Sequence, residues 1–113
     1  MPQHYDAILV TEDRTVITIN LPANPENFAE YAAAVLRCTT LEAFDLADGV
    51  TLWFDEDGAR WPYNALIDEL ANWRGATNSF HGPVLITGYS TGVEPLPFER
   101  ANRLLRDLSR ADA

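Results

Sequence analysis

Two N-terminal stretches of the chain carry the β-branched, partly alternating pattern of strands. They are Tyr5–Val10 and Thr15–Leu21, and the polar residues 11–14 join them. Short runs of this kind, bounded by turn-forming residues, are typical of paired strands. The pattern therefore predicts a β-hairpin at the start of the chain.

The apolar spacing changes to that of a helix after residue 24. Asn24 followed by Pro25 supplies a helix cap and a proline at the first helical position. Apolar side chains then recur three or four residues apart, at Phe28, Tyr31, Ala32, Val35 and Leu36. This spacing predicts an amphipathic helix over residues 25–38.

A second pair of apolar runs predicts a second hairpin. Leu41–Leu46 and Val50–Glu56 flank residues 47–49, which contain the turn-forming pair Asp-Gly. Residues 55–58, Asp-Glu-Asp-Gly, predict a further turn because aspartate and glycine tolerate left-handed backbone conformations. A short strand is expected directly after it, at Ala59–Trp61.

The remaining half predicts two helices and one strand. Asn64 is placed to cap a helix that ends near Gly75 and has an apolar face made of Leu66, Ile67, Leu70 and Ala71. Pro83–Thr87 is a short apolar strand. Pro97 opens a last helix whose inward residues are Phe98, Ala101, Leu104, Leu105 and Leu108.

The order β-β-α-β-β-(β)-α-β-α predicts one α+β domain over residues 1–113, with no internal repeat and no linker. We expect a mostly antiparallel sheet of four or five strands, with three helices packed mainly on one face. The other face would then be open. Alternation along Val50–Glu56 places Leu52 and Phe54 on the helix side and Trp53 on the open side.

The charge is acidic and uneven. The net charge is −9, and residues 1–57 account for all of it, with eleven carboxylates against Arg14 and Arg37. An acidic surface repels phosphate, which argues against direct nucleic-acid binding. No apolar run is long enough to span a membrane and no signal peptide is visible, so we expect a cytoplasmic protein.

Several patterns that suggest chemistry fail on inspection. Residues 88–92 read G-x-S-x-G, but no histidine follows Ser90 and prolines separate the turn from the next helix. The only cysteine, Cys38, has no paired base nearby. Residues 55–58 do not fit a calcium-binding loop either: aligning Gly58 with the glycine of an EF-hand places Trp53, which has no side-chain oxygen, at the first ligand position. We therefore predict no catalytic residue, no metal site and no cofactor.

Aromatic residues with polar tips gather around the second helix. Trp61, Tyr63, Asn64 and Trp73, together with Trp53, are candidates for a binding surface because such side chains dominate interaction hot spots. Packing and helix capping are the more ordinary explanation of the same residues.

Charged residues suggest two further surfaces. Arg103 and Arg106 share a narrow sector of the last helix, which is either a solvated face, a docking stripe for an acidic surface, or a site for a phosphate-bearing ligand. Asp55, Glu56 and Asp57 are candidates for an acidic face that attracts a partner protein.

A set of short, glycine-anchored motifs spans about residues 38–108. It comprises the hairpin that turns at Asp48-Gly49, the Asp55–Gly58 turn, Pro62-Tyr63-Asn64 at a helix start, and the strand Gly82–Gly88. In these motifs the chain resembles a small uncharacterised family, a domain of unknown function found in bacteriophages, plasmids and their prokaryotic hosts. The resemblance implies a mobile-element accessory protein and implies no activity or catalytic residue.

Three functions follow as hypotheses. The first is a non-catalytic acidic protein of a phage or plasmid that binds and modulates a host protein, plausibly a defence component. The second is an oligomeric small-ligand binder that sequesters a nucleotide-like signal, with arginines holding phosphate. The third is an enzyme of unrecognised type, for which His81 is the first residue to test.

Overall fold

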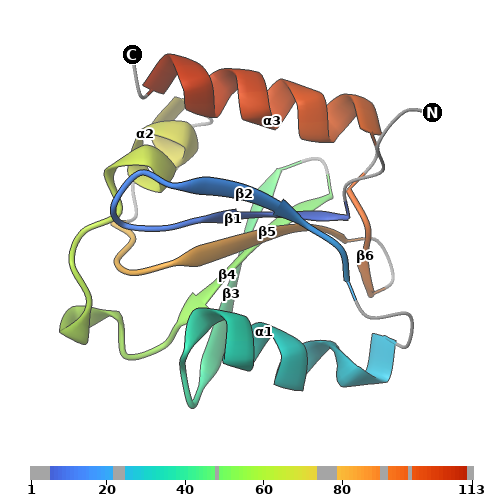
Figure 1. The fold of residues 1–113 in the computed structure, drawn as a ribbon, viewed down its shortest axis with the longest axis vertical. Coiled ribbons are helices and arrows are strands. Elements are labelled where there is room, and N and C mark those ends of the chain that lie inside the picture. Colours follow the sequence, from blue (N-terminus) through green and yellow to red (C-terminus); the bar gives the residue numbers. More distant parts are fainter. Residues whose placement is uncertain are drawn as a thin grey trace.

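A computed structural model describes residues 6–21, 25–47, 49–73, 79–89, 92–96 and 98–111 (Figure 1). The strands are β1 (Ala7–Val10), β2 (Val16–Ile19), β3 (Leu41–Ala47), β4 (Val50–Asp55), β5 (Val84–Tyr89) and β6 (Val93–Glu94). The α-helices are α1 (Phe28–Leu36), α2 (Ala65–Trp73) and α3 (Phe98–Ala111), and short 3-10 turns cover Pro25–Asn27 and Gly58–Arg60.

One antiparallel sheet organises these elements. Its strand order is β2-β1-β5-β4-β3, and β6 pairs with the end of β5. Both predicted hairpins are confirmed, since β1 pairs with β2 and β3 pairs with β4. The predicted α+β class and the element order are therefore confirmed, with β6 as an additional short strand that sequence patterning missed.

The helices cover both faces of the sheet, so the fold has three layers (Figure 1). The larger core lies between the sheet and the pair α2 and α3, and includes Leu52, Leu70 and Leu104. The smaller core lies under α1 and is built around Phe28 and Leu85. All three helices were expected mainly on one face, with the opposite face open; instead α2 and α3 share one face and α1 covers the other (Figure 1).

Trp53 illustrates this correction. Alternation along β4 was predicted to separate it from Leu52 and Phe54, and it does. Trp53 nevertheless lies under α1, where its ring meets that of Phe28 edge-on with centroids 4.9 Å apart. Its indole N–H donates to Oγ1 of Thr87 at 2.8 Å. A side chain with these contacts packs the second core and does not form an open binding face.

The segment after β4 also differs from its prediction. Ala59–Trp61 was expected to be a strand, but Gly58–Arg60 forms a 3-10 turn closed by the Trp61 N–H donating to the Gly58 carbonyl at 2.9 Å. The predicted turn at residues 55–58 is present, and it leads into this 3-10 turn. Asn24, Gly75, Ser90 and Pro97, which also carried predictions, lie outside the described residues.

Candidate binding site

The outer edge of β2 is a free strand edge. β2 ends the sheet on one side, and no strand among the described residues pairs with it beyond β1. Its four residues, Val16–Ile19, are all β-branched and carry no charge. Val16 and Ile17 are 36% and 42% exposed, so two adjacent apolar side chains face water here. Edges of this kind are templates for pairing with another chain.

Hydrogen-bonding groups of Val16 and Thr18 point away from β1. The Thr11 N–H donates to the Thr15 carbonyl at 2.9 Å, which makes this a hydrogen-bonded pair. Bonded and non-bonded pairs alternate along an antiparallel ladder. With the observed register, Ile17 therefore bonds to β1, whereas Val16 and Thr18 present their N–H and C=O groups outward.

The free part of this edge ends at Asn20. Its carbonyl accepts a hydrogen bond of 2.8 Å from the hydroxyl of Tyr31 on α1. The next residue, Leu21, turns inward and donates its N–H to Oδ2 of Asp6 at 2.9 Å. The strand thus offers a short open stretch between the hairpin turn and the residue that α1 already occupies.

The opposite edge of the sheet is built differently. β3 carries the carboxylates of Glu42 and Asp45, and its register shifts between Asp45 and Ala47. Charges and bulges are the features by which proteins prevent edge-to-edge pairing. Because β3 has both features and β2 has neither, the two edges are not equivalent, and β2 is the one suited to accept a strand.

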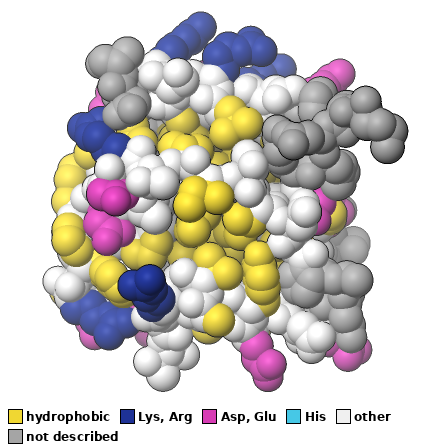
Figure 2. Space-filling view, in the orientation of Figure 1, with side chains coloured by type: hydrophobic (Ala, Val, Ile, Leu, Met, Phe, Trp, Pro, Cys, Tyr) yellow, Lys and Arg dark blue, Asp and Glu magenta, His cyan; other side chains and the backbone are white. Residues whose placement is uncertain are grey.

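A groove of about 400 Å³ lies beside this edge on the α1 face. Ile17 of β2 and Leu9 of β1 form its floor, and Val35 of α1 borders it. It continues past Pro83 to Trp61, in the order in which the sheet places β2, β1 and β5. Figure 2 shows hydrophobic side chains gathered in the middle of the face that β2 crosses in Figure 1, with basic side chains over α3 above them.

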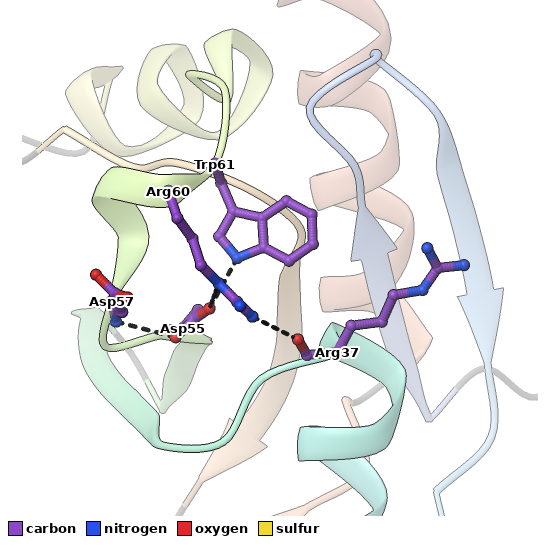
Figure 3. Close-up of polar contacts among 5 residues, drawn as sticks. All are labelled: Arg37, Asp55, Asp57, Arg60 and Trp61. Carbon is purple, nitrogen blue, oxygen red and sulfur yellow. Dashed lines mark hydrogen bonds and ion pairs between the residues drawn. The ribbon is translucent and has the colours of Figure 1, made fainter.

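Trp61 closes the far end of the groove and is held by a polar cluster (Figure 3). Its indole N–H donates to Oδ2 of Asp55 at 2.7 Å, and Nε of Arg60 meets the same oxygen at 3.0 Å. The Arg60 guanidinium lies 5.1 Å from the centre of the Trp61 ring, within the range of a cation–π contact. Trp61 is therefore fixed from both its edge and its face.

Asp55 is the centre of this cluster. Burial raises the pKa of its carboxyl, but hydrogen bonds from Trp61 and the Asp57 N–H, together with the Arg60 charge, lower it further than burial raises it. The net result is an Asp55 pKa below the usual aspartate value. Its carboxylate is only 3% exposed. The prediction that Asp55 belongs to an exposed acidic face is thus wrong, whereas Glu56 and Asp57 are exposed.

Arg37 connects the cluster to the end of α1. It adopts a left-handed conformation, φ 55° and ψ 45°, and its N–H caps the carbonyls of Ala33 and Ala34. This turn directs the Arg37 carbonyl toward Arg60, whose Nη2 donates to it at 2.8 Å. In Figure 3 the Arg37 side chain extends the other way, toward the β1–β2 hairpin, and it lines the groove.

The hairpin turn gives the groove an acidic rim. Glu12 and Asp13 line it at the end near Thr15. Hydrogen bonds from the hydroxyl of Thr11 and from the side chain and N–H of Thr15 lower the pKa of Asp13, so this carboxylate stays charged at neutral pH. With Arg37 as the cation in the lining, the groove carries more negative than positive charge.

The other predicted site residues are not brought together. Asn64 is fully buried. Its Oδ1 accepts from the Ile67 N–H at 3.1 Å, which confirms the helix cap, and its Nδ2 donates to the carbonyl of Gly82 at 2.8 Å and to that of Val10, the last residue of β1, at 3.1 Å. Tyr63 and Trp73 are exposed at opposite ends of α2.

Arg103 and Arg106 are exposed on α3, on the face of the sheet opposite to Trp53 and the Trp61 groove. A single clamp made of these arginines and those two indoles does not form within one chain. Among the described residues, no three His, Cys, Asp or Glu side chains are grouped so that they hold a metal ion. No helix in the described part of the chain has the length and apolarity to cross a membrane.

Two residues bear on catalysis. Burial and the nearby Asp55 charge raise the pKa of the Cys38 thiol, which works against a reactive thiolate. His81 contacts the Trp61 carbonyl through Nδ1 at 3.2 Å, and its ring meets that of Tyr63 edge-on. These are the contacts of a residue that joins two segments, and Tyr63 and His81 also form an isolated β-bridge.

Comparison of the chain with known protein families, curated proteins and solved structures found no significant match. The resemblance to mobile-element proteins therefore stays a prediction. The residues that sequence reasoning missed are Val16, Ile17, Thr18 and Arg37. For Val16, Ile17 and Thr18 the signal was the absence of charge in β2, which gains meaning only when the strand order places β2 at an edge. Arg37 had no such signal in the sequence.

Proposed function

We propose that the protein is a non-catalytic binding protein that recognises another polypeptide by adding its strand to the outer edge of β2. The observation that supports this most directly is the contrast between the two edges of the sheet. β2 is uncharged, β-branched and exposed, whereas β3 carries Glu42, Asp45 and a bulge. Main-chain hydrogen bonds supply affinity in this mode, and side-chain pockets supply specificity.

The groove supplies the pocket that this mode requires. Side chains of an added strand alternate between the two faces of the sheet, so those on the α1 face lie over Ile17 and the groove beside it. Trp61 forms a fixed apolar wall at the far end of this groove, because Asp55 and Arg60 hold it in place. This proposal retains the binding-protein hypothesis and moves the site from Asp55, Trp53 and Asn64 to the β2 edge.

Proline substitutions test the proposal with a matched control. Thr18→Pro and Val16→Pro each remove an N–H that points outward, and they leave the bonds between β1 and β2 in place. Ala43→Pro is the control on the other edge. The Glu56 N–H donates to the Thr40 carbonyl, which makes Thr40 and Glu56 a hydrogen-bonded pair. Bonded and non-bonded pairs alternate along the β3–β4 ladder, so the Ala43 N–H also points outward.

We expect a partner protein captured from the native host to bind wild type and Ala43→Pro with similar affinity. Its affinity for Thr18→Pro should be at least ten-fold lower than its affinity for wild type. In the complex, the Val16 and Thr18 amides should be protected from hydrogen exchange. Circular dichroism and melting temperature establish that each variant is folded. A partner that binds folded Thr18→Pro and Val16→Pro as well as wild type contradicts strand addition at β2.

A further inference from the structure

We infer that the segment that pairs with β2 is an extended, basic stretch of the partner, in which an apolar residue over Ile17 is separated by one residue from a lysine or arginine over Glu12 and Asp13. This inference rests on the proposed strand addition and adds the chemistry of the occupant. It follows from the register of β2, the shape of the groove and the charge around it.

The register determines where each side chain of an added strand lies. A residue opposite Ile17 shares its face, so its side chain meets Ile17 at the near end of the groove, and Leu9 lies next to Ile17 on β1. A residue opposite Thr15, two positions along, lies on the same face at the end where Glu12 and Asp13 form the rim. An apolar and a cationic side chain separated by one residue therefore match two neighbouring parts of the groove.

The charge of the groove favours a cation at the second of these positions. Asp13 has a lowered pKa and remains ionised, and Glu12 lies beside it. Arg37 lines the groove as well: its carbonyl accepts from Arg60, and its side chain extends toward the β1–β2 hairpin (Figure 3), where its single positive charge offsets part of the two negative charges. Arg37 would attract an acidic segment, but both carboxylates would repel it. A basic segment therefore has the better electrostatic match.

The net charge of the whole chain points the same way. A net charge of −9 attracts a basic segment from a distance and repels an acidic one, including a second copy of this chain. A second copy is therefore the less favoured occupant.

Selection from a library of random displayed dodecapeptides tests the inference. The library is selected on the wild-type protein, and the retained peptides are then assayed on wild type, Thr18→Pro and Ala43→Pro. The expected result is a set of peptides that bind Thr18→Pro at least ten-fold more weakly than wild type and bind Ala43→Pro as tightly as wild type. Their sequences should place an apolar residue two positions from a lysine or arginine and carry more lysine and arginine than the input library.

A charge reversal then tests the rim. Glu12→Lys should lower the affinity for the selected basic peptides by about ten-fold. Glu99→Lys on α3 makes the same change in net charge, and it should lower that affinity less than two-fold at 150 mM salt. Equal weakening by both variants overturns the placement of the cation at the rim, because it shows that only the net charge matters.

The outcomes separate the inference from the proposed function. Edge-dependent peptides that are neutral or acidic overturn the basic segment and leave strand addition standing. A selection without any edge-dependent peptide overturns both. Sedimentation that shows a wild-type dimer and a Thr18→Pro monomer overturns the inference in favour of a second copy on β2.

Discussion

The indole Nε1 of Trp61 donates a hydrogen bond of 2.7 Å to Oδ2 of Asp55, a carboxylate that is 3% exposed. This bond joins the end of β4 to the residue after the 3-10 turn, and it holds Trp61 at the far end of the groove beside β2. The same hydrogen bond therefore stabilises the fold and positions one wall of the proposed site.

Replacing Trp61 by phenylalanine should lower the free energy of unfolding by about 2 kcal/mol, because a buried carboxylate loses a hydrogen-bond donor. Chemical denaturation followed by circular dichroism measures the change. Trp73→Phe is the matched control, since Trp73 is exposed on α2 and its replacement should change stability by less than about 0.5 kcal/mol. Equal losses in the two variants would show that the Asp55 contact contributes nothing.

The lowered pKa of Asp55 predicts a pH dependence. Its folded-state pKa lies below the unfolded value of about 3.9, so the charged form is favoured by folding. The resulting stability is fully present above the unfolded pKa and is lost as the pH falls through the folded value. Melting temperatures of wild type and Asp55→Asn between about pH 5 and pH 2 should converge as the pH falls. Parallel curves would contradict this assignment.

Asn64→Ala should be strongly destabilising, by about 3 kcal/mol. The substitution removes the cap of α2 and leaves the Val10 and Gly82 carbonyls without the amide that now donates to them. Denaturant titration measures the loss. Asn72→Ala, at an exposed position on the same helix, should change stability by less than about 0.5 kcal/mol. A small effect at Asn64 would mean that its three hydrogen bonds are replaceable by solvent.

The sequence predicted the hairpins and the helices because each depends on local patterning. Asn64 as a helix cap is one such success, since a polar residue before an apolar helical stripe carries its own signal. The faces of the sheet were harder to predict. Whether α1 lies with α2 and α3 or opposite them depends on the chain crossing after β2, and no local pattern records that choice. Trp53 was therefore placed on the correct side of β4 and wrongly left uncovered.

The site was poorly predicted for a related reason. Aromatic and charged residues such as Asp55 and Trp61 suggested a surface, but in the fold they satisfy one another. Val16 and Thr18 looked like ordinary strand residues. Their importance comes from lying at the end of the strand order, which is a property of the whole sheet and not of the four residues themselves.

Gly82 tests how closely the groove depends on Trp61. Gly82 has φ +75°, and a Cβ atom added to it would lie 2.6 Å from Cγ of Trp61. Gly82→Ala should lower stability by about 2 kcal/mol, through the left-handed backbone and the displaced ring. Its tryptophan emission should also shift. Gly92→Ala is the control, because a Cβ there meets nothing within 4 Å. An unshifted emission in Gly82→Ala would show that Trp61 keeps its place.

Arg103 and Arg106 distinguish the proposed function from a ligand site on α3. Both are exposed, and α3 covers the face of the sheet that does not hold the groove. The double variant Arg103→Ala with Arg106→Ala should therefore unfold within about 0.5 kcal/mol of wild type.

The same double variant should bind edge-dependent peptides within two-fold of the wild-type affinity, since its side chains lie away from Ile17 and the rim of the groove. Isothermal titration with one selected peptide measures this. Titration of the wild type with ADP supplies the second readout, and we expect no saturable heat. Saturable ADP binding that the double variant loses, with peptide binding unchanged, would add a phosphate site on α3 as a second site, separate from the β2 edge. Loss of peptide binding in the folded double variant would instead move the docking surface from β2 to α3.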